Sequence, residues 1–340
     1  MSFRGVENVI VGNLRTLMDA GPLEKLVGKE ISPNGDKLAV YSGPRESTIT
    51  IRSYANELDC RELESEWANT MGNGCKTVTL PAIKRGNQLN VYYVTSDERL
   101  TEYDIDGKVV DVRSEFQHIE IVHSKTFGNM LVLDGLPNLA LSDLVYTESI
   151  MCRGKEDFKG KEILILRGGD GALLNELRKE DPKKVIMVEI DDMVMQACKT
   201  YLRSVCGDSL DNYQGDNYQV CFINGDYCRG LHCHMEKWKA EGKTFDYVIS
   251  DLTDISITKK PSGGIWDFIV KIIDMSFSVL SPNGKYLTHA TGSSNDGALK
   301  CFDYILETQL DRPVTFTKTN AFVPSFLEDW VFYQIELKKV

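Results

Sequence analysis

The sequence predicts an α/β protein whose main part is a mostly parallel sheet with helices on both faces, and three observations lead to that prediction. From about residue 142 onward, short apolar runs alternate with helical patterns, and this alternation is typical of parallel sheets. The first run, at 163–166, stops in the glycine-rich turn of residues 168–171. Two extended segments, at 314–319 and 330–337, predict an antiparallel hairpin at the edge of the sheet.

Three parts are expected along the chain. Residues 1–88 combine strand patterns at 37–41 and 48–54 with helical patterns at 9–18 and 58–71, which predicts a small N-terminal α/β domain. Residues 89–141 hold short strand-like runs bounded by turn residues and predict a small antiparallel β domain. Residues 142–340 form the third domain, whose parallel strands are expected at 163–166, 185–188, 219–223, 247–250 and 285–288.

The composition is that of a soluble globular protein with an acidic balance. The 340 residues carry a formal net charge of −11, which argues against binding to nucleic acid or anionic membranes and favours cationic ligands. No basic segment followed by an apolar core stands at the N-terminus, and no apolar run approaches the roughly 18–20 residues that span a bilayer. Nine cysteines without a paired framework favour reduced thiols, so we expect a cytoplasmic protein.

Acidic residues follow the first four parallel strands. They are Asp170 in the glycine-rich turn, Glu189 and Asp191 after the second strand, Asp226 after the third, and Asp251 with Asp254 after the fourth. Since ligands of open α/β sheets bind beyond the carboxyl ends of the strands, these acids are expected around one cleft. A single acid after a strand more often caps a helix or forms a turn, but four in succession favour a nucleoside site with surplus carboxylates.

The position of Asp170 limits which kind of nucleoside the predicted cleft could bind. A glycine-rich strand-to-helix turn ordinarily attracts an anion, and the carboxylate of Asp170 would repel one. It would repel the carboxylate of S-adenosylmethionine, which makes a methyltransferase the weakest of the alternatives. A sulfonium donor without that carboxylate carries a terminal ammonium, for which Asp170 is an attractive partner. Asp251 would then face the reacting carbon and accept a proton from an incoming amine.

From residue 89 to the C-terminus the chain resembles the aminopropyltransferases of the spermidine/spermine synthase family, and among them most closely the animal spermine synthases. The resemblance rests on the glycine-rich turn and on further motifs: TEYDID at 101–106, HSKTFGN at 123–129, SDLVYT at 142–147, MVEID at 187–191, CGD at 206–208, FDYVI at 245–249, and VPS at 323–325 with WVFY at 330–333. It implies a Rossmann-like, methyltransferase-type sheet. It also implies no bound cofactor, since decarboxylated S-adenosylmethionine is a co-substrate.

The resemblance implies roles for the residues at matching positions. Those implied to bind the nucleoside of the donor are Gln117, Gly168, Gly169, Glu189 and Asp191, with Asp226 and Tyr227 at the adenine. Those implied to bind the polyamine and the aminopropyl group are Tyr146, Asp170, Asp254, Phe326, Glu328 and Trp330. Within these sets, Glu328 matches the acid that holds the far amine of spermidine, and Asp251 matches the proton acceptor.

The implied reaction is a direct displacement, in which the amine of spermidine takes the aminopropyl group and methylthioadenosine leaves. Two features keep alternatives open. Asp254 completes an Asp-x-x-Asp pattern closer to spermidine synthases, so putrescine or another polyamine remains an alternative acceptor. Arg167 stands where the family usually has glycine and would spoil the site if it paired with Asp170. A non-catalytic polyamine- or nucleoside-binding protein is therefore a further hypothesis.

No metal site is expected. Cys228, His232, Cys233 and His234 stand close together, but their spacing fits no standard zinc pattern. His289, after the fifth strand, is interpreted as a packing or supporting residue near the cleft rather than a catalyst. The family resemblance implies a homodimer with residues 1–88 in much of the contact. Small-molecule substrates, rather than nucleic acid or membrane, are the expected partners.

Overall fold

The computed structural model describes residues 89–95, 99–223, 225–252 and 264–338, together with the backbone of five strands nearer the N-terminus. The chain forms two compact units, Met1–Gln88 and Leu89–Val340. In the first unit the strands are β1 (Val9–Ile10), β2 (Glu24–Glu30), β3 (Lys37–Ser42), β4 (Thr48–Ser53) and β5 (Thr79–Leu80).

The first unit contains a three-stranded antiparallel sheet in the order β2-β3-β4 and a separate pair of β1 and β5. β3 and β4 lie where the sequence pattern predicts strands. The prediction of a helix at 9–18 is wrong for its first two residues. Val9 and Ile10 are β-branched and pair as a strand with residues 79–80. The rest of that helix and the helix expected at 58–71 lie outside the described residues.

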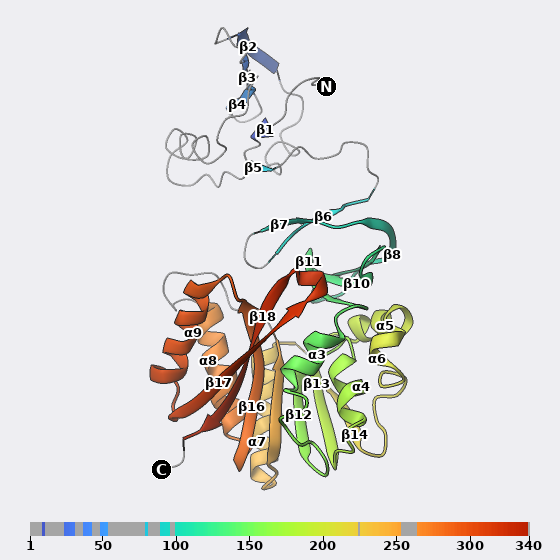
Figure 1. The fold of residues 1–340 in the computed structure, drawn as a ribbon, viewed down its shortest axis with the longest axis vertical. Coiled ribbons are helices and arrows are strands. Elements are labelled where there is room, and N and C mark those ends of the chain that lie inside the picture. Colours follow the sequence, from blue (N-terminus) through green and yellow to red (C-terminus); the bar gives the residue numbers. More distant parts are fainter. Residues whose placement is uncertain are drawn as a thin grey trace. The chain divides into compact units, whose positions relative to one another are not determined.

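The second unit is built on a seven-stranded sheet in the order β14-β13-β12-β15-β16-β18-β17 (Figure 1). Its strands are β12 (Glu162–Arg167), β13 (Lys184–Glu189), β14 (Tyr218–Phe222), β15 (Phe245–Asp251), β16 (Leu280–Gly292), β17 (Val314–Val323) and β18 (Glu328–Leu337). β12 to β16 are parallel, and β18 and β17 extend the sheet beyond β16 as an antiparallel hairpin. The predicted Rossmann-like α/β sheet with an antiparallel C-terminal hairpin is therefore confirmed.

Helices cover both faces of this sheet, as the apolar composition of its strands requires. In β12, Ile163 and Ile165 face one core while Leu164 and Leu166 face the other, and all four are fully buried. The first core is completed by α3 (Leu144–Ile150), α4 (Ala172–Arg178), α5 (Asp192–Tyr201) and α6 (Arg203–Cys206). The second is completed by α7 (Tyr227–Ala240), α8 (Gly264–Phe277) and α9 (Asp296–Thr308). None of the helices in the described residues has the length and apolar character needed to cross a membrane.

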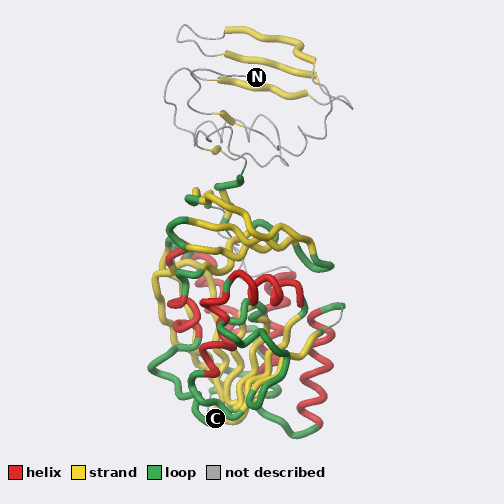
Figure 2. The backbone as a smooth tube through the Cα atoms, turned by 90° about the vertical axis from the view of Figure 1, so that its right-hand side faces the viewer, coloured by secondary structure: helices red, strands yellow, loops and turns green. Residues whose placement is uncertain are grey.

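A small antiparallel layer lies across one end of the main sheet (Figures 1 and 2). It consists of the pair β6 (Tyr92–Val94) and β7 (Leu100–Glu102) and of a four-stranded sheet formed by β8 (Ile105–Arg113), β9 (His118–Ser124), β10 (Gly128–Leu133) and β11 (Leu136–Ala140). Ile119 and Leu131 pack on the first core of the main sheet, whereas Val122 and Val132 belong to a separate core. The sequence does not predict β11, because Pro137 interrupts its apolar pattern.

Asp143 joins this layer to the C-terminal hairpin. Its side chain is fully buried and accepts a hydrogen bond from the Ser325 N–H at 3.0 Å. Burial raises the pKa of Asp143, and the hydrogen bonds from Ser325 oppose that rise. The Tyr103 hydroxyl donates to the Ser325 carbonyl at 2.8 Å. These bonds fix the 3₁₀ turn η2 (Pro324–Phe326) and with it the position of Phe326.

Candidate active site

A cavity of about 520 Å³ lies between the carboxyl ends of the parallel strands and the antiparallel layer. The predicted site residues that line it are Gln117, Tyr146, Gly168, Gly169, Asp170, Glu189, Asp251 and Phe326. β12 lies between β13 and β15 in the sheet, so the segments after these strands meet at one crevice, as expected at the switch point of an open α/β sheet. Leu131 and Leu139 of the antiparallel layer also line the cavity.

The backbone of the glycine-rich turn brings Asp170 to the cavity wall. Gly168 has a φ of 94°, a value that residues with a side chain rarely adopt. At Gly169 a Cβ would lie 2.9 Å from Glu189 Oε2, so glycine lets the turn pass close to that carboxylate. The Asp170 carboxylate accepts a hydrogen bond from the Ala172 N–H at 2.7 Å, which fixes its direction.

The carboxyl group of Asp170 is strongly perturbed. Burial and the nearby charges of Asp251 and Glu189 raise its pKa to about 7, although the Ala172 N–H opposes the rise. The cavity wall carries the carboxylates of Asp134, Asp170, Glu189 and Asp251 and the guanidinium of Arg167. The carboxylates outnumber the cation, which favours a bound cation because it relieves their mutual repulsion. Without such a cation, a proton on Asp170 relieves the same repulsion near neutral pH.

Asp251, at the end of β15, is held by side chains from other elements. The Tyr146 hydroxyl donates to Asp251 Oδ1 at 2.6 Å. His289 Nε2 lies 3.6 Å from the same oxygen, and Trp330 Nε1 donates to His289 Nδ1 at 3.4 Å. With Nδ1 as acceptor, we assign the proton of the neutral imidazole to Nε2, which faces Asp251. The carboxylate is therefore oriented by both Tyr146 and His289.

The sequence places His289 near the cleft as a packing or supporting residue, and the structure shows that it contacts Asp251 there. The structure places it in the cavity wall, with its ring centre 5.7 Å from that of Tyr146. Its signal in the sequence is its place immediately beyond the predicted strand 285–288, at the same edge of the sheet as the acids. A lone histidine is more often a packing residue, and only the contact with Asp251 distinguishes the two interpretations.

Glu189 and Asp191 both follow β13, but their surroundings differ. Glu189 lines the cavity, and its Oε1 accepts hydrogen bonds from the N–H groups of the next two residues at 2.7 and 3.1 Å. Burial raises the pKa of Glu189, while the positive charge of Arg167 opposes the rise. Asp191 is buried and accepts hydrogen bonds from Ser114 Oγ at 2.7 Å and from the Gln117 amide at 2.8 Å. Asp191 thus positions Gln117, which itself lines the cavity.

The other predicted site residues that the structure describes do not line this cavity. Asp226 is exposed and caps α7 by accepting a hydrogen bond from the Arg229 N–H at 2.7 Å, and Tyr227 is buried. Trp330 lines a second, smaller cavity, and Glu328 is paired with Arg99, which also lines that cavity. Asp254 lies outside the described residues. The binding roles of these residues stay predictions.

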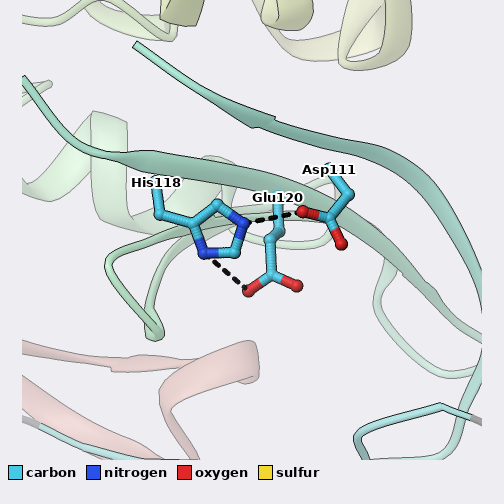
Figure 3. Close-up of side chains that lie close together, drawn as sticks. All are labelled: Asp111, His118 and Glu120. Carbon is cyan, nitrogen blue, oxygen red and sulfur yellow. Dashed lines mark hydrogen bonds and ion pairs between the residues drawn. The ribbon is translucent and has the colours of Figure 1, made fainter. Parts of the chain in front are cut away.

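Among the described residues, one group of side chains has the composition of a metal site. Asp111, His118 and Glu120 lie together on β8 and β9, with His118 Nε2 2.7 Å from Asp111 and Nδ1 3.9 Å from Glu120 (Figure 3). Lys108 Nζ lies 2.9 Å from Asp111 and 2.5 Å from Glu120. The ammonium of Lys108 therefore already pairs with both carboxylates, and the group is an ion-pair network outside the main cavity.

Arg167 does not pair with Asp170 in the part of the chain that the structure describes. Its guanidinium carbon lies 5.8 Å from the centre of the Tyr227 ring, and its Nε is buried without a hydrogen-bond partner. Its φ is 66°, in the left-handed region where a side chain costs about 1–2 kcal/mol. This explains why glycine suits the position. Arg167 itself lines the main cavity, and its charge acts on Glu189 rather than forming an ion pair with Asp170.

Replacing Arg167 by glycine is expected to raise the free energy of unfolding by about 1 kcal/mol, because glycine adopts the positive φ without strain. Arg167→Ala is the matched control, since it removes the same side chain but keeps a Cβ at that φ. Urea unfolding of both variants measures the difference. Equal stability of the glycine and alanine variants would show that the backbone is not strained at this position.

Comparisons with known proteins agree on one family. Residues 143–340 match the spermine/spermidine synthase domain, and residues 91–140 match the spermidine synthase tetramerisation domain. A polyamine aminopropyltransferase of Sulfolobus acidocaldarius is 31% identical over 227 residues, which cover 66% of this chain and 70% of that protein. The spermine synthase of Saccharomyces cerevisiae is 28% identical over 188 residues, covering 53% of this chain and 57% of that protein. A polyamine aminopropyltransferase of Clostridium kluyveri is 34% identical over 155 residues, which cover 45% of this chain and 52% of that protein. The chain therefore spans about half the length of this relative.

Solved structures share the fold. A crystal structure of spermidine synthase in complex with the transition-state analogue AdoDATO aligns with a TM-score of 0.57 at 19% identity, covering 77% of this chain and 84% of that chain. The spermidine synthase of Thermotoga maritima aligns with a TM-score of 0.54 at 19% identity, covering 73% of this chain and 78% of that chain. Since the match to the synthase domain alone spans more than half of the sequence, the chain belongs to the spermine/spermidine synthase family.

Proposed function

We propose that this protein transfers the aminopropyl group of decarboxylated S-adenosylmethionine to a polyamine, with spermidine as the acceptor and with spermine and 5′-methylthioadenosine as products. The observation that carries the proposal is the meeting of Asp170, Glu189 and Asp251 at one cavity. Both substrates are cations, because the donor is a sulfonium with a terminal ammonium and the acceptor is a polyamine. Carboxylates on the cavity wall offset the repulsion between two such cations and hold them in reach of each other.

Each carboxylate has a part in the displacement. Glu189 accepts hydrogen bonds from the ribose hydroxyls, and Asp170 binds the ammonium of the donor and so orients its aminopropyl chain. The electron pair of the acceptor nitrogen attacks the methylene carbon beside the sulfonium. A C–N bond forms, the C–S bond breaks, and its electron pair stays on sulfur, which leaves as a neutral thioether.

The acceptor nitrogen must lose a proton during this reaction. Its pKa in solution is close to that of lysine, about 10.4, so it arrives as an ammonium. Asp251 takes the proton, and its contacts with Tyr146 and His289 keep the carboxylate oriented for that task. Since the leaving group departs uncharged, no general acid is needed. Catalysis then depends on positioning and on this single proton transfer.

Putrescine is the second candidate acceptor, and one contact favours it. Glu328, the residue proposed to hold the far amine of spermidine, is already paired with Arg99 at 2.6 Å. A diamine has no third nitrogen that needs Glu328. Membership of the spermine/spermidine synthase family is compatible with either acceptor.

A panel of acceptors tests the proposal. The purified protein is incubated with decarboxylated S-adenosylmethionine and with putrescine, spermidine or spermine, and the products are identified by mass spectrometry. We expect methylthioadenosine in all productive mixtures and the fastest turnover with spermidine. If methylthioadenosine forms with no polyamine, the enzymatic proposal fails. Use of intact S-adenosylmethionine in preference to the decarboxylated donor would favour a methyltransferase instead.

We also propose that the protein acts as a cytoplasmic homodimer. The match of residues 91–140 to a domain named for tetramerisation supports self-association. The cysteines within the described residues are free thiols, as suits a reducing compartment. Light scattering of the purified chain measures its mass in solution, and microscopy of a fluorescent fusion measures its location. A monomeric mass would contradict the dimer, and secretion would contradict the location.

A further inference from the structure

Arg99 and Glu328 form an ion pair at the edge of the proposed acceptor site. Arg99 Nη2 lies 2.6 Å from Glu328 Oε2, and the Ser294 N–H donates to Glu328 Oε1 at 2.8 Å. Both oxygens of the carboxylate therefore have a partner before any substrate binds. Such a charge-assisted hydrogen bond is stronger than one between neutral groups, so a ligand that needs Glu328 must compete for it.

The ion pair adjoins the main cavity. Arg99 lines a second cavity, of about 20 Å³, together with Trp330 and Phe326. Phe326 also lines the cavity of about 520 Å³, so it stands at the boundary between the two. The ring centres of Phe326 and Trp330 are 4.7 Å apart, and their faces attract either a guanidinium or an ammonium. Arg99 thus lines the same small cavity as two aromatic rings, next to the main cavity.

Of the two partners, Arg99 is the more able to move. The side chain of Glu328 is 9% exposed, against 38% for Arg99. A Cβ on Gly292 would lie 2.2 Å from Glu328 Oε2, which means that the carboxylate packs directly on that glycine. A long arginine side chain can turn its head toward water while its stem stays in contact with the protein. An incoming cation would therefore displace Arg99 and leave Glu328 in place.

We propose that Arg99 sets the selectivity for acceptor length by competing with the distal ammonium of a triamine for Glu328. This inference rests on the proposed polyamine function. Spermidine is longer than putrescine by one aminopropyl unit, so with its reacting nitrogen at Asp251 its far ammonium reaches further toward Glu328. A triamine must displace Arg99, whereas a diamine leaves the ion pair intact. The apparent affinity for the triamine is its intrinsic affinity multiplied by the fraction of molecules in which Glu328 is not paired with Arg99.

The variant Arg99→Met tests this directly, because methionine keeps an unbranched apolar stem and removes the charge. The dissociation constants of spermidine and putrescine are measured by calorimetry with methylthioadenosine bound, and KM and kcat are measured in parallel. We expect the spermidine dissociation constant and KM to fall on the order of tenfold, with the putrescine values and both kcat values unchanged. Arg99→Lys keeps a competing cation and is expected to behave as the original protein does.

Two further variants keep the test decisive. Arg178→Met is the matched control, because Arg178 pairs with Asp208 at 2.7 Å and neither residue lines either cavity. In a Glu328→Gln background, Arg99→Met should no longer improve spermidine binding. An unchanged or weaker spermidine affinity in Arg99→Met, or an equal gain for both acceptors, would overturn the proposal. If no acceptor is turned over, the proposed function fails, whereas the ratio of the two binding constants still tests the role of Arg99.

Discussion

Replacing Asp251 by asparagine is expected to lower kcat by about 10²–10⁴-fold, the range that positioned proton transfer contributes. The amide keeps the shape of the carboxylate, and its oxygen still accepts the hydrogen bond that Tyr146 makes at 2.6 Å. The amide cannot take a proton from the acceptor amine, so the attacking nitrogen stays protonated. Methylthioadenosine carries no reacting amine, and its dissociation constant should not change. Steady-state turnover and calorimetric binding of methylthioadenosine measure the two effects separately.

Asp246→Asn is the matched control for this experiment. Asp246 lies on the same strand as Asp251, and its Oδ2 accepts a hydrogen bond from the Glu162 N–H at 2.9 Å, away from the cavity lining. The control should retain full turnover, since an amide oxygen accepts the same bond. If Asp251→Asn turns over at the original rate, Asp251 is not the proton acceptor. Loss of methylthioadenosine binding in the same variant would point to a damaged cavity.

Binding of the cationic donor is expected to depend on pH through Asp170. Because its pKa is raised to about 7, Asp170 carries a proton below that pH when no ligand is bound, and the donor ammonium must displace this proton. The dissociation constant of decarboxylated S-adenosylmethionine should therefore rise by up to tenfold for each unit that the pH falls below about 7, and level off above it. Methylthioadenosine has no ammonium, so its binding should lack this slope.

Asp170→Asn should remove the slope and weaken donor binding at pH 8 by about 10–100-fold, the value of a lost hydrogen bond between charged groups. Asp134→Asn is the control, because Asp134 also lines the cavity and asparagine tolerates its positive φ of 50°. In Asp251→Asn the midpoint should move to lower pH, since the charge of Asp251 helps to raise the Asp170 pKa. A donor affinity that does not vary between pH 5.5 and 8 would contradict the assignment.

Much of the fold of the second unit could be predicted from the sequence. The central parallel strands β12, β13 and β15 are buried on both faces, and each contains an uninterrupted apolar run that marks its position. β11 could not be recognised in this way, because Pro137 and Asn138 break its pattern and its place depends on pairing with β10. The start of the first expected helix failed for a related reason, since a two-residue strand takes its partner from 69 or more residues away.

The acids of the site could be predicted because parallel strands bring their carboxyl ends to one edge. Asp170, Glu189 and Asp251 therefore meet at the cavity. The same rule wrongly predicts that Asp191 and Asp226 also line the cavity. Asp191 instead binds the amide of Gln117, and Asp226 caps the start of α7. Contacts between distant segments leave no mark in the local pattern. Arg99 and Glu328, 229 residues apart, are the clearest case.

Transfer of a labelled aminopropyl group tests the central claim most directly. Decarboxylated S-adenosylmethionine with ¹³C in its aminopropyl carbons is incubated with the protein and spermidine, and the label is followed by mass spectrometry. We expect the label to appear in spermine in step with the release of unlabelled methylthioadenosine. Label that remains on the nucleoside while spermidine stays unchanged would contradict aminopropyl transfer by this protein to that acceptor.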